Sequence, residues 1–335
     1  MVHADTRTRA TRVGHQARGV KWRRAERRSS LLGSVTAAVT SDIVVMATSK
    51  AASSTAEIAP DEPDDEACHE LPWWSRTLCG YHQRFTEPFE LKLSEIARRS
   101  TRTLSIEQRP RVSAAHAAES KASADGLCTG ATVWDAGIVL ASYVHARAGG
   151  ADFLPIDWAG GARLRCLDLG SGTGIVGLAA AASCVFERVV LTDLPSVVPL
   201  LEANAAANSL SGVLACTVQC LPLRWEDESH LDAVAARGPY NLIVAGDVLY
   251  RPPVVAPLLN ALRRLATPGV TDVLVAASLA HSPESMAAFR EQCAPHFELH
   301  VVPAADQPEA RRSPEVHIYR LRKRASQKKR RRERG

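Results

Sequence analysis

One short glycine-rich segment constrains the fold of this 335-residue chain more than any other feature. Residues 168–174 read DLGSGTG; they follow an apolar run and precede an Ala-rich run at 175–182 that is typical of a helix. Glycine lets the backbone approach a ligand closely, and the first turn of a helix offers N–H groups that have no partner within the helix. A strand, a glycine turn and a helix in this order predict a nucleotide pocket, with a purely structural turn as the alternative.

Apolar strand-like runs alternate with helix-like stretches from residue 163 onward, which is the pattern of a parallel sheet covered on both faces. The last two runs follow each other without a clear helix between them, so they predict a closing antiparallel hairpin. Valine and leucine recur at helical spacing over residues 255–265, which predicts an amphipathic helix. Seven strands are expected, at residues 164–169, 189–192, 214–218, 241–245, 273–277, 298–302 and 316–321.

The expected fold class is thus α/β, with a Rossmann-like, mostly parallel sheet, and composition divides the chain into four parts around it. A basic and then acidic leader, expected to be disordered, comes first. An N-terminal extension follows, with alternating strands at 89–93 and 103–107 and a mobile Ala/Ser-rich insert. The sheet core comes next, and a basic tail, also expected to be disordered, ends the chain. These parts are residues 1–70, 71–130, 131–323 and 324–335.

Charge is distributed unevenly along the chain. Residues 1–30 carry nine Arg/Lys against two acids and residues 320–335 carry ten against one, which leaves 22 basic and 33 acidic residues in 31–319. The acidic body disfavours nucleic acid as the main ligand, although the basic tail keeps RNA association open. No apolar run is long enough for a membrane span, and the eight cysteines form no C-x-x-C pair that would indicate zinc. We therefore expect neither a membrane nor a metal as partner.

The glycine segment fits two kinds of cofactor. Residues 172–177 also match the G-x-G-x-x-G fingerprint of dinucleotide binding. Asp168 favours a methyl donor over NAD, because a carboxylate suits the donor's amino-acid end where the dinucleotide motif usually has an apolar residue. Asp193 ends the second expected strand, where it can accept the ribose hydroxyls of either cofactor or, alternatively, cap a helix before Pro195. The choice of cofactor stays open on these residues alone.

Small and polar residues follow the fourth expected strand. In an open parallel sheet the carboxyl ends of the strands line the ligand crevice, so Asp247 and Tyr250 are expected on its lip. Gly246 would leave room for the donor. Trp225, after the third strand, can lie against an adenine ring, although ordinary core packing explains a lone tryptophan equally well. A capping aspartate with a packed tyrosine is the corresponding structural alternative at the lip.

In this order, these residues resemble the small seven-strand protein-lysine methyltransferases, the group that includes the methyltransferase acting on the valosin-containing AAA ATPase. The resemblance extends from Leu104 to about Lys323. Two departures concern Asp168, where family members often have Glu, and the insert before Gly130, which is longer than usual. The matching segments are LSIEQ at 104–108, GATVWDAGIVL at 130–140, the glycine motif, LTDLP at 191–195, Asn204 to Asn208, LRW at 223–225, DVLY at 247–250 and EVHIYR at 315–320.

The resemblance implies a class I methyltransferase that uses S-adenosyl-methionine and methylates a lysine side chain of a protein substrate. Asp247 and Tyr250 would form the catalytic D-x-x-Y motif, with Asp247 orienting the incoming ammonium and Tyr250 narrowing the channel. The acceptor must lose a proton before attack, because a free lysine with a pKa of about 10.4 is mostly charged at neutral pH. The implied donor site comprises Trp134, Asp168, Gly170, Ser171, Gly172, Gly174, Asp193, Trp225 and Gly246.

Other functions remain open on the sequence. Methyl transfer to RNA or to a small amine keeps the same fold, but nucleobase enzymes typically have Asn/Asp-Pro-Pro-Tyr where this chain has DVLY at 247–250. A catalytically silent binding module is disfavoured by the intact glycines, and an NAD-dependent oxidoreductase lacks a convincing Tyr-x-x-x-Lys or His/Asp pair. We expect a monomer in the cytoplasm, with a nuclear pool if the basic tail is an address or a mitochondrial pool if the leader is one.

Overall fold

The computed structural model of the protein describes residues 87–96, 102–109, 129–148, 150, 153, 164–279 and 283–325. The predictions for the leader, for the Ala/Ser-rich insert before residue 129 and for the tail beyond residue 325 lie outside the described residues. The division of the chain at residues 70, 130 and 323 therefore stays a prediction. Among the residues described, none of the helices combines the length and apolarity that a membrane span needs.

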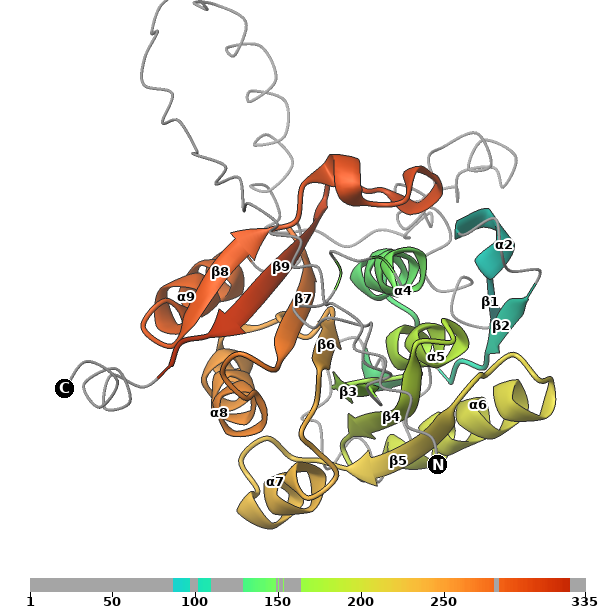
Figure 1. Ribbon diagram of the computed structural model, residues 1–335, viewed down its shortest axis with the longest axis horizontal. Coiled ribbons are helices and arrows are strands. Elements are labelled where there is room, and N and C mark those ends of the chain that lie inside the picture. Colours follow the sequence, from blue (N-terminus) through green and yellow to red (C-terminus); the bar gives the residue numbers. More distant parts are fainter. Residues whose placement is uncertain are drawn as a thin grey trace, which may run out of the picture. The chain divides into compact units, whose positions relative to one another are not determined.

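A seven-stranded sheet with the order β5-β4-β3-β6-β7-β9-β8 forms the centre of the described part (Figure 1). Strands β3 to β7 run parallel, and the last strand, β9, lies antiparallel between β7 and β8. This arrangement confirms the expected fold class and its closing hairpin. The strands are β3 (Leu164–Leu169), β4 (Phe186–Asp193), β5 (Thr217–Pro222), β6 (Leu242–Gly246), β7 (Asp272–Ser278), β8 (Phe297–Val301) and β9 (Val316–Lys323).

Helices cover both faces of the sheet, and each face has its own apolar core. One core joins α4, α5 and α6 to the sheet, and the other joins α7, α8 and α9 to the opposite face. Strand β7 is buried along its whole length, as expected for a strand covered on both sides. The helices are α4 (Asp135–Arg147), α5 (Ile175–Ala182), α6 (Val198–Leu210), α7 (Glu228–Ala235), α8 (Val255–Leu265) and α9 (Pro283–Cys293).

The third strand of the core departs from the sequence prediction. It was expected at residues 214–218, but β5 begins at Thr217 and pairs with β4 from there to Pro222. The Val213 amide donates to the Asn208 carbonyl and the Ala215 amide donates to the Ala181 carbonyl, so the preceding residues are held against the ends of α6 and α5. Apolar residues that resembled a strand are therefore part of the loop that leaves α6.

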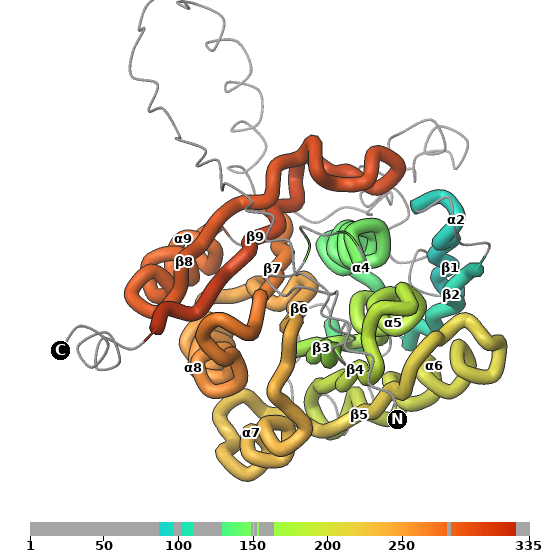
Figure 2. Tube along the Cα trace, viewed as in Figure 1, coloured from blue at the N-terminus to red at the C-terminus, as the bar shows by residue number. Residues whose placement is uncertain are grey.

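A second, two-stranded sheet precedes the core. Strands β1 (Phe89–Lys92) and β2 (Thr103–Ile106) pair antiparallel, with the short helix α2 (Leu93–Ile96) after β1. Their alternating apolar side chains are buried in the core that contains α4 and α5. Figure 2 shows the hairpin beside α5 and α6, both of which contact β2. The two strands expected in the N-terminal extension are confirmed.

Candidate active site

The glycine loop between β3 and α5 has a geometry that only glycine accommodates well. Gly170 and Gly172 have φ values of 67° and 56°, in the left-handed region that disfavours residues with a Cβ. A Cβ on Gly170 would also lie 2.9 Å from Cγ1 of Val248, and one on Gly172 would lie 3.0 Å from the carbonyl oxygen of Gly130. Backbone conformation and close packing therefore both select glycine, whether or not a ligand is bound.

Asp168 is fully buried under this loop. Its Oδ2 accepts a hydrogen bond of 2.8 Å from the amide of Gly177 in the first turn of α5, and its Oδ1 has no hydrogen-bond partner among the described residues. Burial raises the pKa of the carboxyl to about 7; the bond from Gly177 opposes the shift and the charge of Asp193 adds to it. Asp168 thus anchors the loop, and its contact with a donor stays a prediction.

Asp193, at the end of β4, joins the glycine loop to the segment that leads into α6. Its Oδ2 accepts from the amide of Gly172 and its Oδ1 accepts from the amide of Leu194, both at 2.7 Å. Ser171 adds a second tie between the strands, because its hydroxyl donates to the Asp168 carbonyl and accepts from the Thr192 amide. The two carboxylates and the serine therefore hold the loop in shape from within.

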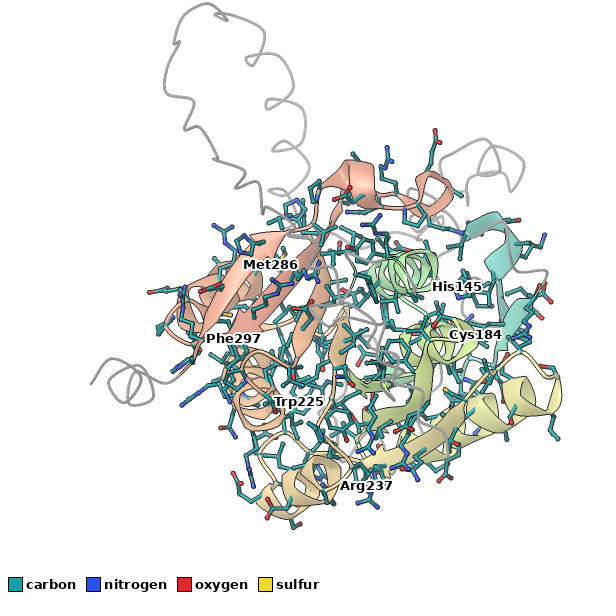
Figure 3. The ribbon with its side chains drawn as sticks, in the orientation of Figure 1. His145, Cys184, Trp225, Arg237, Met286 and Phe297 are labelled. Atoms are coloured by element: carbon teal, nitrogen blue, oxygen red, sulfur yellow. The ribbon has the colours of Figure 1, made fainter. Side chains whose placement is uncertain are left out.

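Two tryptophans lie near the loop. Trp225, labelled in Figure 3, lies in the segment after β5. Its ring packs so close to the loop that a Cβ on Gly170 would be 3.2 Å from its Cζ2. The same half-buried ring rests on the core between the sheet and α7 and α8, so core packing accounts for its surroundings, and its contact with an adenine ring stays a prediction. Trp134 immediately precedes α4, and its indole Nε1 donates to the carbonyl of Thr129 at 2.8 Å.

Gly246 ends β6 where two helices approach the strand. A Cβ there would lie 3.0 Å from Cγ2 of Val176 in α5 and 3.2 Å from Cα of Gly137 in α4. The space left by the missing side chain is occupied by these helices, and helix packing is enough to require a glycine. The expected reason, room for the donor, is not needed to explain the residue, and its place in the donor site stays a prediction.

The segment after β6 turns sharply and ends in an exposed tyrosine. Asp247 has a φ of 57°, which for a residue with a side chain costs on the order of 1 kcal/mol, and its amide donates to the Ala276 carbonyl at 2.8 Å. Val248 and Leu249 are buried and anchor the turn. Tyr250 is 40% exposed, with the guanidinium carbon of Arg251 5.5 Å from its ring centroid. The strained aspartate and the exposed tyrosine thus follow one buried strand.

Comparison with known proteins identifies the family to which this arrangement belongs. The family model described as lysine methyltransferase matches residues 120–291, about half of the chain. The chain belongs to the lysine methyltransferase family. EEF1A lysine methyltransferase 3 of Mus musculus is 31% identical over 199 residues, which cover 59% of this chain and 74% of that protein. Protein N-lysine methyltransferase METTL21A of Danio rerio is 32% identical over 149 residues, covering 44% and 61%. Protein-lysine N-methyltransferase EEF2KMT of Homo sapiens is 32% identical over 146 residues, covering 41% of each.

Membership in the lysine methyltransferase family confirms the predicted enzyme class. The residues predicted for its site come from the carboxyl ends of β3, β4 and β6, from the segments that follow β3, β5 and β6, and from the segment before α4, which contacts the glycine loop through Gly130. They therefore gather at the carboxyl edge of the sheet. At this edge a donor and an acceptor can meet. Among the described residues, no group of three or more side chains could hold a metal ion.

Sequence reasoning missed three contributors to this site. Val248 packs against Gly170, Gly130 packs against Gly172, and Nδ2 of Asn204 donates to the Thr173 carbonyl inside the loop at 2.9 Å. The first two are apolar or backbone contacts that carry no residue-type signal. All three residues belonged to matching segments of the resemblance without a role, and for Asn204 its spacing of four from Asn208 on one helix face was the available clue.

Proposed function

We propose that this lysine methyltransferase takes its methyl group from S-adenosyl-methionine and transfers it to a lysine side chain of another protein. The observation that carries the proposal is the glycine loop at residues 170–174, which is held by Asp193 at 2.7 Å and covered by the ring of Trp225. A family member with this loop at the carboxyl edge of a parallel sheet has the parts that a nucleotide-like methyl donor requires.

The charges around the loop suit this donor. S-adenosyl-methionine, when bound, supplies a methyl group on a positively charged sulfur, which a neutral amine can displace in line. The donor also carries an ammonium group, and two carboxyl groups adjoin the loop, Asp168 in β3 and Asp193 at the end of β4. Of these, Asp168 has a buried Oδ1 without a hydrogen-bond partner among the described residues. A nearby cation would lower the pKa of that carboxyl from about 7 and favour its ionised form. The donor and this site therefore fit each other electrostatically.

The predicted donor residues would divide the binding of the donor among them. The loop would present its backbone to the amino-acid and ribose portions of the donor through Gly170, Ser171, Gly172 and Gly174. A Cβ at either of the first two glycines would meet neighbouring atoms, so the loop keeps this shape only without side chains there. Asp193 would bind the ribose hydroxyls, and Trp225 would flank the adenine. The other members of the proposed donor site are Trp134, Asp168 and Gly246.

On the acceptor side, Asp247 and Tyr250 would handle the lysine. A carboxylate at the lip can orient the incoming ammonium, and an exposed aromatic ring can narrow the channel around the aliphatic stem and exclude water. Partial desolvation then lowers the pKa of the lysine, so that it loses its proton before attack. Because the first relative above is named for EEF1A, that protein is the first acceptor to test.

The first experiment is calorimetric titration of the full chain with S-adenosyl-homocysteine and, in parallel, with NADH. The wild type should bind S-adenosyl-homocysteine alone, and Asp193→Ala should abolish binding. Asp232→Ala is the matched control, because Asp232 pairs with Arg264 on the surface of α7, away from the loop. Binding of NADH alone, or of neither ligand, contradicts the proposal.

The second experiment follows transfer of labelled methyl groups to EEF1A and to a lysate treated to remove existing methylation. Label on lysine supports the proposal, whereas label on RNA or on small amines alone contradicts the protein acceptor.

A monomeric state and a cytoplasmic location also stay proposals. Light scattering after size exclusion tests the first, and imaging of the tagged full chain tests the second.

A further inference from the structure

The N-terminal hairpin β1–β2 lies before residue 120, where the match to the family model begins. Two asparagines of α6, Asn204 and Asn208, tie it to the core, and both are only 2% exposed. They are four residues apart and so lie on one face of the helix. The hairpin is therefore attached to α6 by polar side chains as well as by apolar packing.

The side-chain amides of the two asparagines form hydrogen bonds with the backbone along β2, as a neighbouring third strand would. Oδ1 of Asn208 accepts from the Ser105 amide at 3.1 Å, and its Nδ2 donates to the Ser105 carbonyl at 2.8 Å. Oδ1 of Asn204 accepts from the Glu107 amide at 2.8 Å, and its Nδ2 donates to the Glu107 carbonyl at 3.1 Å. Since Ser105 and Glu107 are two residues apart, both pairs lie along one edge of β2.

The two asparagines differ in their remaining contact. The second Nδ2 hydrogen of Asn204 donates to the carbonyl of Thr173, within the glycine loop, at 2.9 Å. That of Asn208 donates to the Asn204 carbonyl within α6, also at 2.9 Å. Asn204 alone thus joins the hairpin, α6 and the glycine loop through one side chain.

A second set of hydrogen bonds connects the hairpin to the segment before α4. Oε1 of Gln108, just after β2, accepts from the Val133 amide, and its Nε2 donates to the Glu87 carbonyl, both at 2.8 Å. The Arg109 amide donates to the Ala131 carbonyl at 2.9 Å. These bonds fix the segment that leads directly into Trp134 and α4.

We propose that the N-terminal hairpin is part of the donor site, and that Asn204 and Gln108 are positioning residues for donor binding. Asn204 holds the glycine loop and Gln108 holds the segment before Trp134, so the positions of the loop and of this segment both depend on the same hairpin. This inference rests on the proposed function, because it concerns the site assigned there to S-adenosyl-methionine. It adds that residues before the family match determine donor affinity.

The test compares Asn204→Asp with Asn208→Asp in the full chain. Each variant keeps the size and the Oδ1 acceptor of the side chain and loses two N–H donations, but only Asn204→Asp loses the bond to the glycine loop. We expect similar falls in the melting temperature. Binding of S-adenosyl-homocysteine should weaken about tenfold more in Asn204→Asp, since a buried carbonyl is left without its donor. Equal donor affinities in the two variants overturn the proposal.

Hydrogen exchange in the donor-free protein provides a readout that does not depend on the proposed function. Amides of the loop at 170–177 should exchange faster in Asn204→Asp than in Asn208→Asp, and those at 131–134 should exchange faster in Gln108→Leu. If the wild type binds no S-adenosyl-homocysteine, the proposed function fails, and equal loop exchange in the two asparagine variants separately overturns the coupling. Should the aspartate variants not fold, Asn204→Ala and Asn208→Ala allow the same comparison.

Discussion

The proposed donor and acceptor halves of the site differ in how far they are organised in advance. In the donor half, Asp168 and Asp193 accept backbone N–H bonds at 2.7 to 2.8 Å, and the loop at 170–174 is held from within. In the acceptor half, Asp247 has a strained backbone and Tyr250 exposes 40% of its surface. A loop held rigidly in advance suits a small ligand common to many enzymes, whereas an exposed segment leaves recognition to the surface of the partner protein.

The largest effect should come from breaking the donor half at Gly172. Gly172→Ala combines an unfavourable φ with a contact of 3.0 Å to the Gly130 oxygen, and we expect the affinity for S-adenosyl-homocysteine to fall by about a hundredfold or more, equivalent to about 3 kcal/mol. Gly269→Ala is the matched control, since Gly269 has a φ of 73° but nothing within 4 Å of the added Cβ. Calorimetry should detect a loss of binding in the first variant only. Comparable binding in both would mean that the close contact with Gly130 is unimportant.

Asp247→Asn should impair the proposed acceptor half and leave the proposed donor half intact. Asparagine tolerates the left-handed backbone, so the fold and donor binding should persist, while turnover falls about a hundredfold because the acceptor is no longer oriented by a charge. Steady-state methylation of the acceptor measures turnover, and calorimetry measures the donor. Normal turnover with tight acceptor binding would assign the acceptor role to another residue.

A change of another kind should appear in the pH dependence of stability. The pKa of Asp168 is about 7 in the folded chain against an ordinary value of 3.8, so between about pH 4 and pH 7 the folded state retains a proton that the unfolded state has lost. The free energy of unfolding should therefore fall as pH rises through this window, by up to a few kcal/mol. Urea titrations of wild type and Asp168→Asn test this, because the variant should lack that slope. Parallel curves would place the pKa of Asp168 near its ordinary value.

The same ionisation should affect donor binding. A cationic donor favours the ionised Asp168 carboxyl, so wild-type affinity for S-adenosyl-homocysteine, which keeps the ammonium group, should rise as pH increases through about 7. Calorimetry from pH 6 to pH 8 measures this change. Asp168→Asn should bind with less dependence on pH in this range, and an unchanged pH profile would argue against an ammonium beside Asp168.

The bounds of several helices and strands could be predicted from local sequence alone. Residues 175–182 and 255–265 form helices with the expected bounds, and the strand before the glycine loop also has its expected bounds. In each case the composition or apolar periodicity of a short segment coincides with its burial in the fold. The lysine methyltransferase family was likewise recognisable, because its motifs occur in order along the chain.

Other features depended on partners distant in sequence. Strand β5 begins at Thr217 instead of residue 214 because its register is determined by pairing with β4 and by contacts of the preceding loop with two helices. Gly246 is explained by the approach of α4 and α5, which no local pattern indicates. Local apolar composition therefore identified a strand nearby but could not determine where its pairing starts.

The sequence by itself determined the order of strands and helices, the glycine turn and the chemical types of the residues at the site, since these depend on neighbours in the chain. Only the tertiary structure decided that Asp168 is buried with a raised pKa and that Asn204 joins β2 to the glycine loop. The physical reason is separation along the chain. Asn204 is 97 residues from Glu107 and 31 from Thr173, and hydrogen bonds over such distances exist only after the sheet and helices have packed.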